Sequence, residues 1–156
     1  MKLTAKTDLD APAEFLHACL CDTALWEREA SRRGVEIERP ADMPLAGVGA
    51  GWRVRVPFRG RPRKVLLRLD AQTEGRVVAY SFDGQALVGS VQLETAPLSA
   101  RRSRLKVIVD AKPRTLAARL FLNTLRLARR KVEDRMDRRV AQLGTLIAER
   151  YRRDRG

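Results

Sequence analysis

The sequence has few of the residues on which metal binding and covalent catalysis depend. Its 156 residues include two cysteines, Cys19 and Cys21, and one histidine, His17. In a helix Cys19 points about 200° away from His17, so only His17 and Cys21 share a face, and two ligands are too few for a metal site. We therefore expect no metal, no cofactor and no Ser-His or Cys-His catalytic residues. The two thiols are poorly placed to bridge each other and are expected to be reduced.

Long apolar runs and phosphate-binding loops are also missing. No run approaches the ~20 residues of a membrane span, and the first residues lead into polar alternation, which is not the core of a signal peptide. Gly47–Gly51 is not followed by Lys-Ser/Thr and precedes a strand, so it is expected to be a loop. These absences predict one cytoplasmic domain over residues 1–156, with a basic end that frays from about Arg150.

Acidic residues are in the minority. Thirty-two lysines and arginines against nineteen acidic residues give a net charge of +13, and nearly all the basic residues are arginine. Two basic clusters offer phosphate contacts, one at Arg59, Arg61, Arg63 and Lys64 and one at Arg101, Arg102 and Arg104. Apart from Phe58 they lack interleaved aromatic residues, so nucleic acid is disfavoured as a partner. Weak contact with an anionic membrane surface stays open, as does an arginine-biased composition without a partner. The sequence does not indicate an oligomeric state.

What the chain does contain is alternation. Lys2–Asp10 alternates with period two, which predicts a half-buried strand. Two short helices follow, the first starting near Pro12 with Asp10 or a neighbour as its cap, and the second ending at Gly34. Five strand-like segments separated by turn residues then predict an antiparallel meander. Their expected buried faces include the following residues: Trp52, Val54, Val56 and Phe58; Val65, Leu67 and Leu69; Val91, Leu93 and Thr95; Leu105, Val107, Val109 and Ala111.

The tail predicts a single long amphipathic helix over Thr115–Arg153. Its apolar residues recur in steps of three and four, and Thr115 is the expected N-cap. The stripe comprises Phe121, Leu125, Ala128, Val132, Met136, Val140, Leu143 and Ile147. A helix of this kind needs a receiving surface, which the curved antiparallel sheet supplies. The expected fold is therefore α+β, a helix-grip arrangement in which the sheet wraps around the long C-terminal helix and two short helices follow the first strand.

Two short motifs carry a resemblance to a known family. The segments Asp8–Leu16 and Leu20–Glu27, together with the element order, resemble the SRPBCC superfamily. This superfamily includes START lipid-transfer domains, polyketide cyclases and the birch pollen allergen. The resemblance covers essentially the whole chain and implies a hydrophobic cavity between sheet and helix. It does not by itself assign a function.

The cavity is expected between the inward sheet residues and the helix stripe, with Trp26 near one end and Tyr80 as a polar group. Arg129, which falls within the stripe, would favour a ligand with an acidic end. The expected ligand-binding residues are Trp26, Trp52, Val54, Val56, Leu67, Leu69, Tyr80, Val91, Leu93, Phe121, Leu125, Arg129, Val132 and Met136.

Three functions are compatible with this sequence. The first is non-enzymatic binding or transport of a hydrophobic small molecule, such as a lipid, a quinone or a polyketide-like compound. The second is an enzyme similar to polyketide cyclases and aromatases, although a pair of acid-base groups facing the cavity is hard to assemble from the sequence. The third is a basic surface that binds anionic membrane or nucleic acid. The sequence favours the first.

Overall fold

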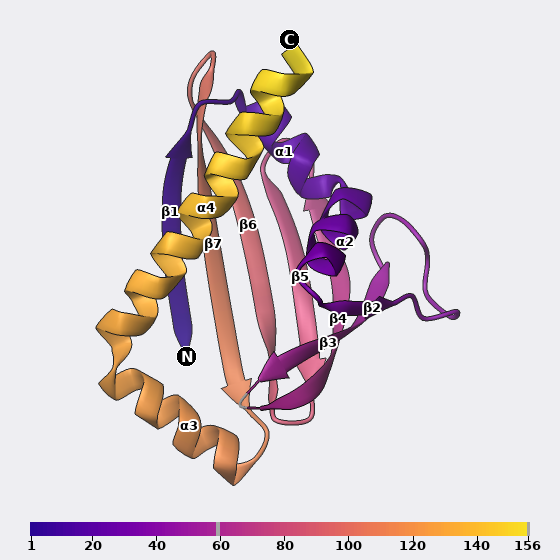
Figure 1. The fold of residues 1–156 in the computed structure, drawn as a ribbon, viewed down its shortest axis with the longest axis vertical. Helices are drawn as coiled ribbons and strands as arrows, with labels where there is room; N and C mark the ends of the chain where they lie inside the picture. Colours follow the sequence, from indigo (N-terminus) through magenta and orange to yellow (C-terminus); the bar gives the residue numbers. More distant parts are fainter. Residues whose placement is uncertain (59, 156) are drawn as a thin grey trace.

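The computed structural model describes residues 1–58 and 60–155. Seven strands and four helices follow one another along this part of the chain, and the sheet is covered by helices on one face (Figure 1). The elements are β1 (Lys2–Leu9), α1 (Ala13–Cys21), α2 (Thr23–Arg32), β2 (Glu36–Glu38), β3 (Gly51–Phe58), β4 (Arg61–Thr73), β5 (Val77–Gly84), β6 (Leu87–Ser99), β7 (Arg102–Pro113), α3 (Leu116–Leu127) and α4 (Arg129–Arg155).

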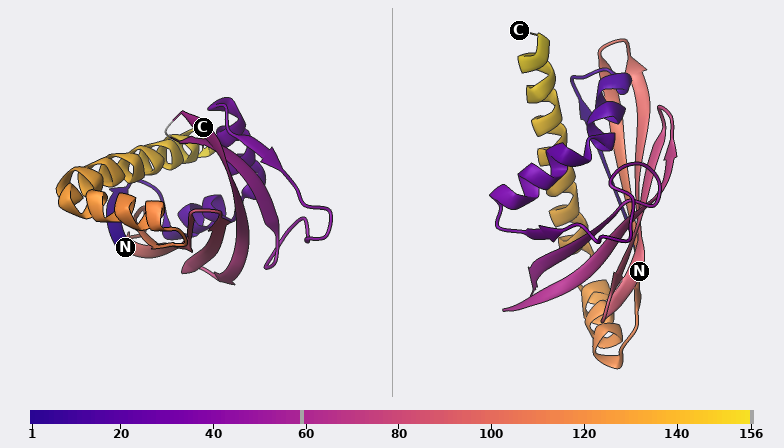
Figure 2. Two further views of the ribbon diagram at one scale, coloured as in Figure 1. Left: turned by 90° about the horizontal axis from the view of Figure 1, so that it is seen from below. Right: turned by 90° about the vertical axis from the view of Figure 1, so that its right-hand side faces the viewer.

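The strands form one antiparallel sheet in the order β1-β7-β6-β5-β4-β3-β2. Its register places the residues of the predicted buried faces opposite one another: Trp52 pairs with Leu67, Val91 with Val109 and Leu105 with Thr7. The sheet is strongly curved (Figure 2). The helix-grip fold expected from the sequence is confirmed. The side chains of Phe58 and Arg59 lie outside the described residues.

Strand β2 was not predicted. Its three residues, Glu-Ile-Glu, pair with β3 through Ile37 and Val54, but three residues are too few to show a period of two. The loop after β2 is tied to the sheet by two backbone hydrogen bonds, from the Gly49 amide to the Leu69 carbonyl and from the Leu69 amide to the Ala50 carbonyl. This segment extends the sheet beyond β3.

The predicted single helix over Thr115–Arg153 is wrong in one respect, because the structure divides it into α3 and α4. The break is at Ala128, whose backbone angles of φ −104° and ψ 28° leave the helical region. The chain turns sharply there, so α3 covers the end of β7 while α4 runs back along β1 (Figure 1). The expected cap is confirmed, since Thr115 Oγ1 accepts a hydrogen bond from the Ala118 amide at 3.1 Å.

The two short helices are joined by a shared residue. Asp22 ends α1 and caps α2, because its Oδ1 accepts a hydrogen bond from the Leu25 amide at 3.2 Å. The start of α1 differs from the expectation: Pro12 occupies the N-cap without a side-chain hydrogen bond, and Asp10 instead pairs with Arg102 at 3.0 Å. Gly34 follows α2 with φ 80°, the left-handed conformation that favours glycine at a helix end.

The core lies where α1 and the second half of α4 pack on the concave face of the sheet. Leu16, Leu20, Leu69, Leu105 and Ile147 are its largest fully buried apolar side chains besides Val78. Helix α4 packs mainly on β1, at one edge of the sheet. Gly144 allows the close approach, because a Cβ added there would lie 2.8 Å from Thr7 Cγ2. The middle of the helix, around Gly144, is therefore held against the edge strand.

The basic C-terminal end continues this helix. The sequence predicts fraying from about Arg150, yet α4 is helical through Arg155. Two contacts account for this: the Tyr151 ring lies 5.0 Å from the Phe15 ring, and Arg150 pairs with Asp22 at 3.6 Å. Within residues 1–58 and 60–155, none of the helices has the length and apolar character to cross a bilayer.

The approach of α4 to β1 leads to a prediction at Gly144. Alanine is a better helix former than glycine by about 1 kcal/mol. At this position, however, its methyl group would meet the stiff β-branched side chain of Thr7. We expect Gly144→Ala to lower the free energy of unfolding by about 1–2 kcal/mol, the range of a small overpacking, as measured by urea denaturation.

The control is Thr7→Ser, which removes the opposing methyl group. In the Thr7→Ser background, Gly144→Ala should lower the free energy of unfolding by less than it does in the wild type, or should raise it. The coupling free energy between the two substitutions should therefore be opposite in sign to the effect of Gly144→Ala alone. A Gly144→Ala variant more stable than the wild type in the presence of Thr7 would show that the two elements are not held at this distance.

Candidate functional site

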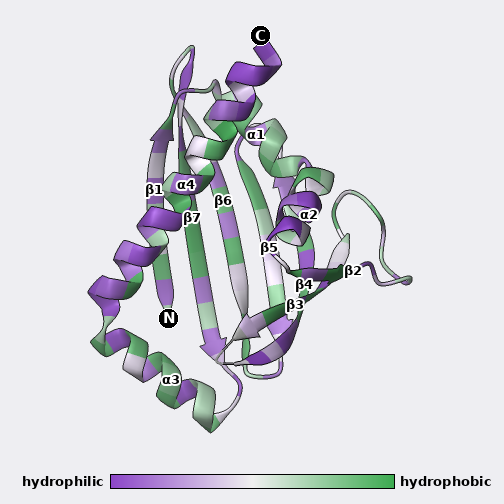
Figure 3. Cartoon of the chain, in the orientation of Figure 1, coloured by the Kyte–Doolittle hydropathy of each residue, from purple (hydrophilic) through white to green (hydrophobic). Residues whose placement is uncertain are grey.

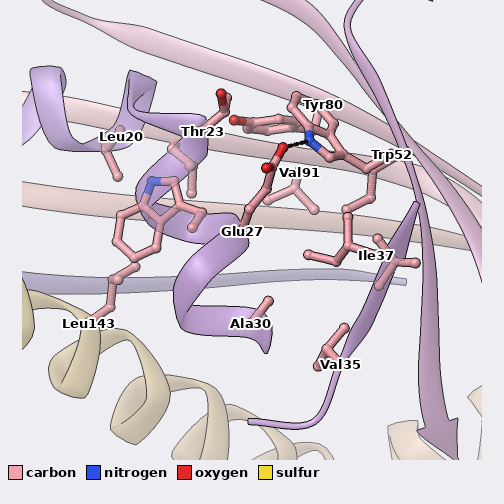
Figure 4. Close-up of a pocket in the computed structure, with 14 residues that line it drawn as sticks. Leu20, Thr23, Glu27, Ala30, Val35, Ile37, Trp52, Tyr80, Val91 and Leu143 are labelled. Carbon is pink, nitrogen blue, oxygen red and sulfur yellow. Dashed lines mark hydrogen bonds between the residues drawn. The ribbon is translucent and has the colours of Figure 1, made fainter. Parts of the chain in front are cut away.

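A pocket of about 320 Å³ opens between α2, the concave face of the sheet and α4 (Figure 4). Its walls are almost wholly apolar, and eight elements besides the α2–β2 connection contribute to it. The lining residues are Leu20 from α1, Thr23, Trp26, Glu27 and Ala30 from α2, Val35, Ile37 from β2, Trp52 and Val54 from β3, Leu67 from β4, Tyr80 from β5, Val91 and Leu93 from β6, and Leu143 from α4.

Local sequence explains both walls. On the sheet side, alternation brings every second residue of adjacent strands to the concave face. On the helix side, Thr23, Trp26, Glu27 and Ala30 stand at steps of three, one and three, so they form one stripe of α2 that faces the sheet. Helix α4 contributes only Leu143, because it lies over β1 and not over the middle of the sheet.

Glu27 is the charged residue of the pocket wall, and one hydrogen bond and one ion pair fix its carboxylate. Trp52 Nε1 donates a hydrogen bond to Glu27 Oε1 at 2.6 Å, and Arg39 Nε lies 2.8 Å from the same oxygen. The Arg39 guanidinium also stacks 4.6 Å from the centre of the Trp52 ring. Among the described residues Glu27 Oε2 has no hydrogen-bond partner, so this oxygen is available to a molecule in the pocket.

Tyr80 is the second polar group. Its ring lies 6.1 Å from the ring of Trp52, and burial, with a smaller contribution from the Cys21 thiol, raises the pKa of Tyr80 to about 12. The phenol is therefore protonated at neutral pH and can donate a hydrogen bond. Thr23, Glu27 and Tyr80 point toward one another at one end of the pocket, whereas Val35 and Leu143 line its apolar part (Figure 4). The site thus has a polar end and an apolar end.

The second tryptophan is held by the backbone. Trp26 Nε1 donates a hydrogen bond to the Cys19 carbonyl at 2.8 Å, which holds the indole in place at the edge of the pocket. Near it, Cys21 Sγ lies 3.5 Å from His17 Nε2, and burial raises the pKa of Cys19 to about 11 and that of Cys21 above its usual value. Both thiols are free. Among the described residues no group of three or more metal-ligating side chains comes together.

Half of the residues expected to bind a ligand line this pocket. These are Trp26, Trp52, Val54, Leu67, Tyr80, Val91 and Leu93. The other half lie elsewhere: Leu69 is fully buried in the core, Val56 lies beyond the pocket on β3, Phe121 and Leu125 lie on α3, and Arg129, Val132 and Met136 lie in the first turns of α4. Of the polar strand residues, Thr95 is buried in the core and Ser81 pairs with Arg68 and Ser90 on the opposite face.

Arg129 is not at the cavity mouth that the sequence suggested. The break at Ala128 makes it the first residue of α4, where its side chain is 52% exposed. Its guanidinium pairs with Glu133 at 2.7 Å and donates to the Lys2 carbonyl at 3.1 Å. The position of an acidic ligand group beside Arg129 is therefore not supported. Arg55 on β3 is also occupied outside the pocket, because it pairs with Glu36 at 3.7 Å.

Seven lining residues were missed: Leu20, Thr23, Glu27, Ala30, Val35, Ile37 and Leu143. The signal for three of them was present, since Thr23, Glu27 and Ala30 share the α2 stripe with Trp26, and polar residues inside an apolar stripe mark a site. The signal for Leu143 was also present, because it belongs to the predicted tail stripe. Val35 and Ile37 carried no signal, since β2 is too short.

The basic clusters considered for nucleic acid are largely paired or scattered. Arg102 pairs with Asp10 and Arg104 with Asp8, and the Arg104 hydrogen bonds lower the pKa of Asp8. In the first cluster Arg59 lies outside the described residues, and Arg61, Arg63 and Lys64 are exposed along β4.

The burial of Tyr80 leads to a prediction about its ionisation. Since burial disfavours the phenolate, the tyrosinate absorbance at 295 nm that is lost in Tyr80→Phe should develop only around pH 12. The raised pKa contributes stability that is complete below about pH 10, the ordinary tyrosine value, and is lost as the pH rises toward 12. Tyr80→Phe should therefore lose less stability over that interval. A difference absorbance that appears near pH 10 would mean that the phenol is solvated.

No family model matches the chain, and no curated protein matches it. Solved structures do resemble it. They include the Zhui aromatase/cyclase from Streptomyces sp. R1128, with 20% identity, a TM-score of 0.64 and 93% of each chain covered. A START superfamily protein from Mycobacterium smegmatis has 17% identity and a TM-score of 0.54, with 91% of this chain and 98% of that chain covered.

A third structure contains ligands. Norcoclaurine synthase from Thalictrum flavum, in complex with dopamine and hydroxybenzaldehyde, has 10% identity and a TM-score of 0.64, with 80% of this chain and 76% of that chain covered. At such identities the likeness establishes the architecture, and it agrees with the sheet order and helix positions described above. The chain has the helix-grip fold that these solved structures share.

Proposed function

We propose that this protein binds a small, mainly apolar molecule that carries a hydrogen-bond donor, in the pocket between α2 and the sheet. The observation that carries the proposal is the single carboxylate in an otherwise apolar wall. Glu27 is fixed by Trp52 and Arg39 through one oxygen, and its other oxygen is unbonded among the described residues. Pockets of this composition use a few placed polar groups to orient a ligand.

The polar groups define the ligand's chemistry. A carboxylate oxygen accepts hydrogen bonds, so the free oxygen of Glu27 favours a ligand that carries a hydroxyl, phenol or amine. Tyr80 donates or accepts beside it. This replaces the acidic ligand suggested by Arg129, which lies outside the pocket.

The size of the pocket limits the size of the ligand. At about 320 Å³ it lies near the lower end of the ~300–1,000 Å³ usual for ligand sites. A compound of one or two rings suits this space better than a long acyl chain or an isoprenoid tail. Dopamine and hydroxybenzaldehyde, bound by a protein of the same fold, are one-ring compounds with phenolic hydroxyls, which supports the class without naming the ligand. The cytoplasmic location expected from the sequence stays a prediction.

A second candidate is an enzyme that resembles the cyclases. A specific observation favours keeping it: Glu27, Tyr80 and Thr23 gather at one end of the pocket, which supplies the acid-base groups that sequence reasoning did not find. The protonated phenol could donate a proton or hydrogen bond while the carboxylate accepts one. We favour binding alone because Oε1 of the carboxylate already accepts a hydrogen bond from Trp52 and pairs with Arg39, which holds Glu27 as a fixed acceptor.

Occupancy of the pocket can be tested by filling it. Trp26 and Trp52 are the chain's two tryptophans and both line the pocket, so intrinsic fluorescence reports binding there. We expect Ala30→Phe to weaken binding of a co-purifying or screened ligand by at least about tenfold, which is ~1.4 kcal/mol. The matched control is Ala24→Phe on the exposed side of α2, which should bind as the wild type does. Native mass spectrometry of protein from its own host identifies the ligand.

If Ala30→Phe and Ala24→Phe weaken binding equally, then a bulky residue on either side of α2 disturbs binding. The pocket would then not be the site. Unchanged affinity in Ala30→Phe would place the ligand elsewhere on the molecule. Binding without turnover supports a carrier or sensor, whereas accumulation of a cyclised or condensed product that Tyr80→Phe abolishes supports the enzyme.

The role of Glu27 is tested with a ligand pair that differs in one donor. Hydroxybenzaldehyde and its methoxy analogue serve as probes in calorimetric titrations. Since a hydrogen bond to a charged group contributes about 1.5–3 kcal/mol, we expect the hydroxy compound to bind at least about tenfold more tightly, and Glu27→Gln to remove most of that preference. The control, Glu29→Gln, removes the ion pair with Arg32 outside the pocket and should keep the preference for the hydroxy compound. Equal affinities of the two probes for the wild type would overturn the donor requirement.

A further inference from the structure

Helix α3 exposes a row of leucines. Leu116, Leu120 and Leu127 are 72%, 58% and 92% exposed, and at 3.6 residues per turn they lie within about 40° of arc on one side of the helix. The opposite side carries the buried Ala118 and Leu122, which pack toward the rest of the molecule. Scattered exposed leucines are ordinary, but these three share one stripe, which the exposed Asn123 interrupts between Leu120 and Leu127. We call this surface the α3 leucine face.

The surroundings of this face are strongly basic. Residues 111–132 contain seven basic residues and no acidic one: Lys112, Arg114, Arg119, Arg126, Arg129, Arg130 and Lys131. In the described part of the chain only Arg114 and Arg129 of these seven form ion pairs, with Asp83 and Glu133. Arg119 and Arg126 flank the leucines on one side, about 60–80° around the helix from Leu116. Apolar and cationic groups thus alternate around the helix surface (Figure 3).

The position of α3 leaves this face accessible. The helix lies at one end of the molecule, beyond the ends of the long strands, and projects from the body (Figures 1 and 2). It packs on β7 and on α4 through its other side. No residue of α3 lines the pocket, so the surface is separate from the candidate ligand site.

We propose that the α3 leucine face docks onto an anionic membrane surface, with the leucines in the headgroup boundary and Arg119 and Arg126 against lipid phosphates. An apolar stripe bordered by arginines is the composition of helices that lie in the plane of a membrane interface. Charge complementarity decides between occupants. A second copy of the chain would bring two clusters of seven basic residues together, whereas an anionic bilayer neutralises them.

The shape of the surface agrees with this occupant. The face is the convex side of a single helix, and the pocket between α2 and the sheet has no lining residue from α3. A bilayer interface accepts a convex apolar ridge without a complementary groove. The helix has twelve residues, so it lies on the membrane and does not cross it.

The test is sedimentation with vesicles of phosphatidylcholine alone and of phosphatidylcholine with phosphatidylglycerol. We expect binding to the anionic vesicles that weakens with added salt, because screening removes the arginine contribution. Arg119→Gln with Arg126→Gln should lower the partition coefficient about 25-fold, about fivefold for each charge. Leu120→Ser with Leu127→Ser should lower it at least about tenfold. All four positions are exposed, so the fold should be kept, which circular dichroism checks.

Matched controls distinguish the α3 leucine face from the effects of net charge and of exposed apolar surface elsewhere on the molecule. Arg28→Gln with Arg101→Gln makes the same charge change elsewhere, and Leu45→Ser with Val48→Ser removes two exposed apolar residues from the loop before β3. Both controls should bind the anionic vesicles nearly as the wild type does. If the control variants lose as much vesicle binding as the α3 variants, then net charge or total apolar surface causes the binding. That result would overturn the proposal.

Other outcomes also count against it. Absence of binding to the anionic vesicles overturns the docking role directly. A concentration-dependent dimer that the leucine variants abolish, seen by analytical ultracentrifugation without lipid, would mean that a second copy covers the face. Binding of an acidic protein in preference to vesicles, lost in the same variants, would identify a protein partner. The ligand pocket is unaffected by any of these results.

Discussion

The placement of α4 against the edge strand β1 determines how the rest of the concave face is used. Gly144 brings the helix close to Thr7, and Val140 and Ile147 are buried on either side of it. A helix held at the edge cannot also fill the middle of a curved sheet. The surface of β3–β6 is therefore left to α1 and α2, and only Leu143 reaches across to it. The pocket is a consequence of this off-centre packing.

The strands were predictable and the division of the tail was not, for a physical reason. One face of each long strand is buried, so apolar and polar residues alternate in segments such as Trp52–Phe58. This alternation fixes the register of the strands. The tail stripe continues through Ala128 without a glycine or proline, so its local sequence favours one uninterrupted helix. What breaks it is tertiary: α3 packs on the end of β7, while Arg129 contacts the Lys2 carbonyl and starts α4 along β1.

The same distinction separates the two walls of the pocket. Alternation alone places Val54, Leu67 and Val91 on the concave face, and all three line the pocket. The helix wall depends on which helix covers that face, and this is not a local property of any segment. The apolar stripe of the long tail pointed to Arg129, which does not line the pocket. The charged residue that does line the pocket, Glu27, lies in the α2 stripe. The sign of the expected ligand charge changes with that choice of helix.

The net charge of +13 is distributed unevenly, which bears on its meaning. On the sheet, Arg55, Arg68, Arg102 and Arg104 each pair with a carboxylate at the surface. Such exposed pairs contribute little stability but cancel one another's charge. Seven of the thirteen net charges arise from residues 111–132, about a seventh of the chain, where acidic residues are absent. A general bias toward arginine would spread the excess along the sequence. Its concentration around the one helix with an exposed apolar stripe argues instead for a surface that meets an anionic partner.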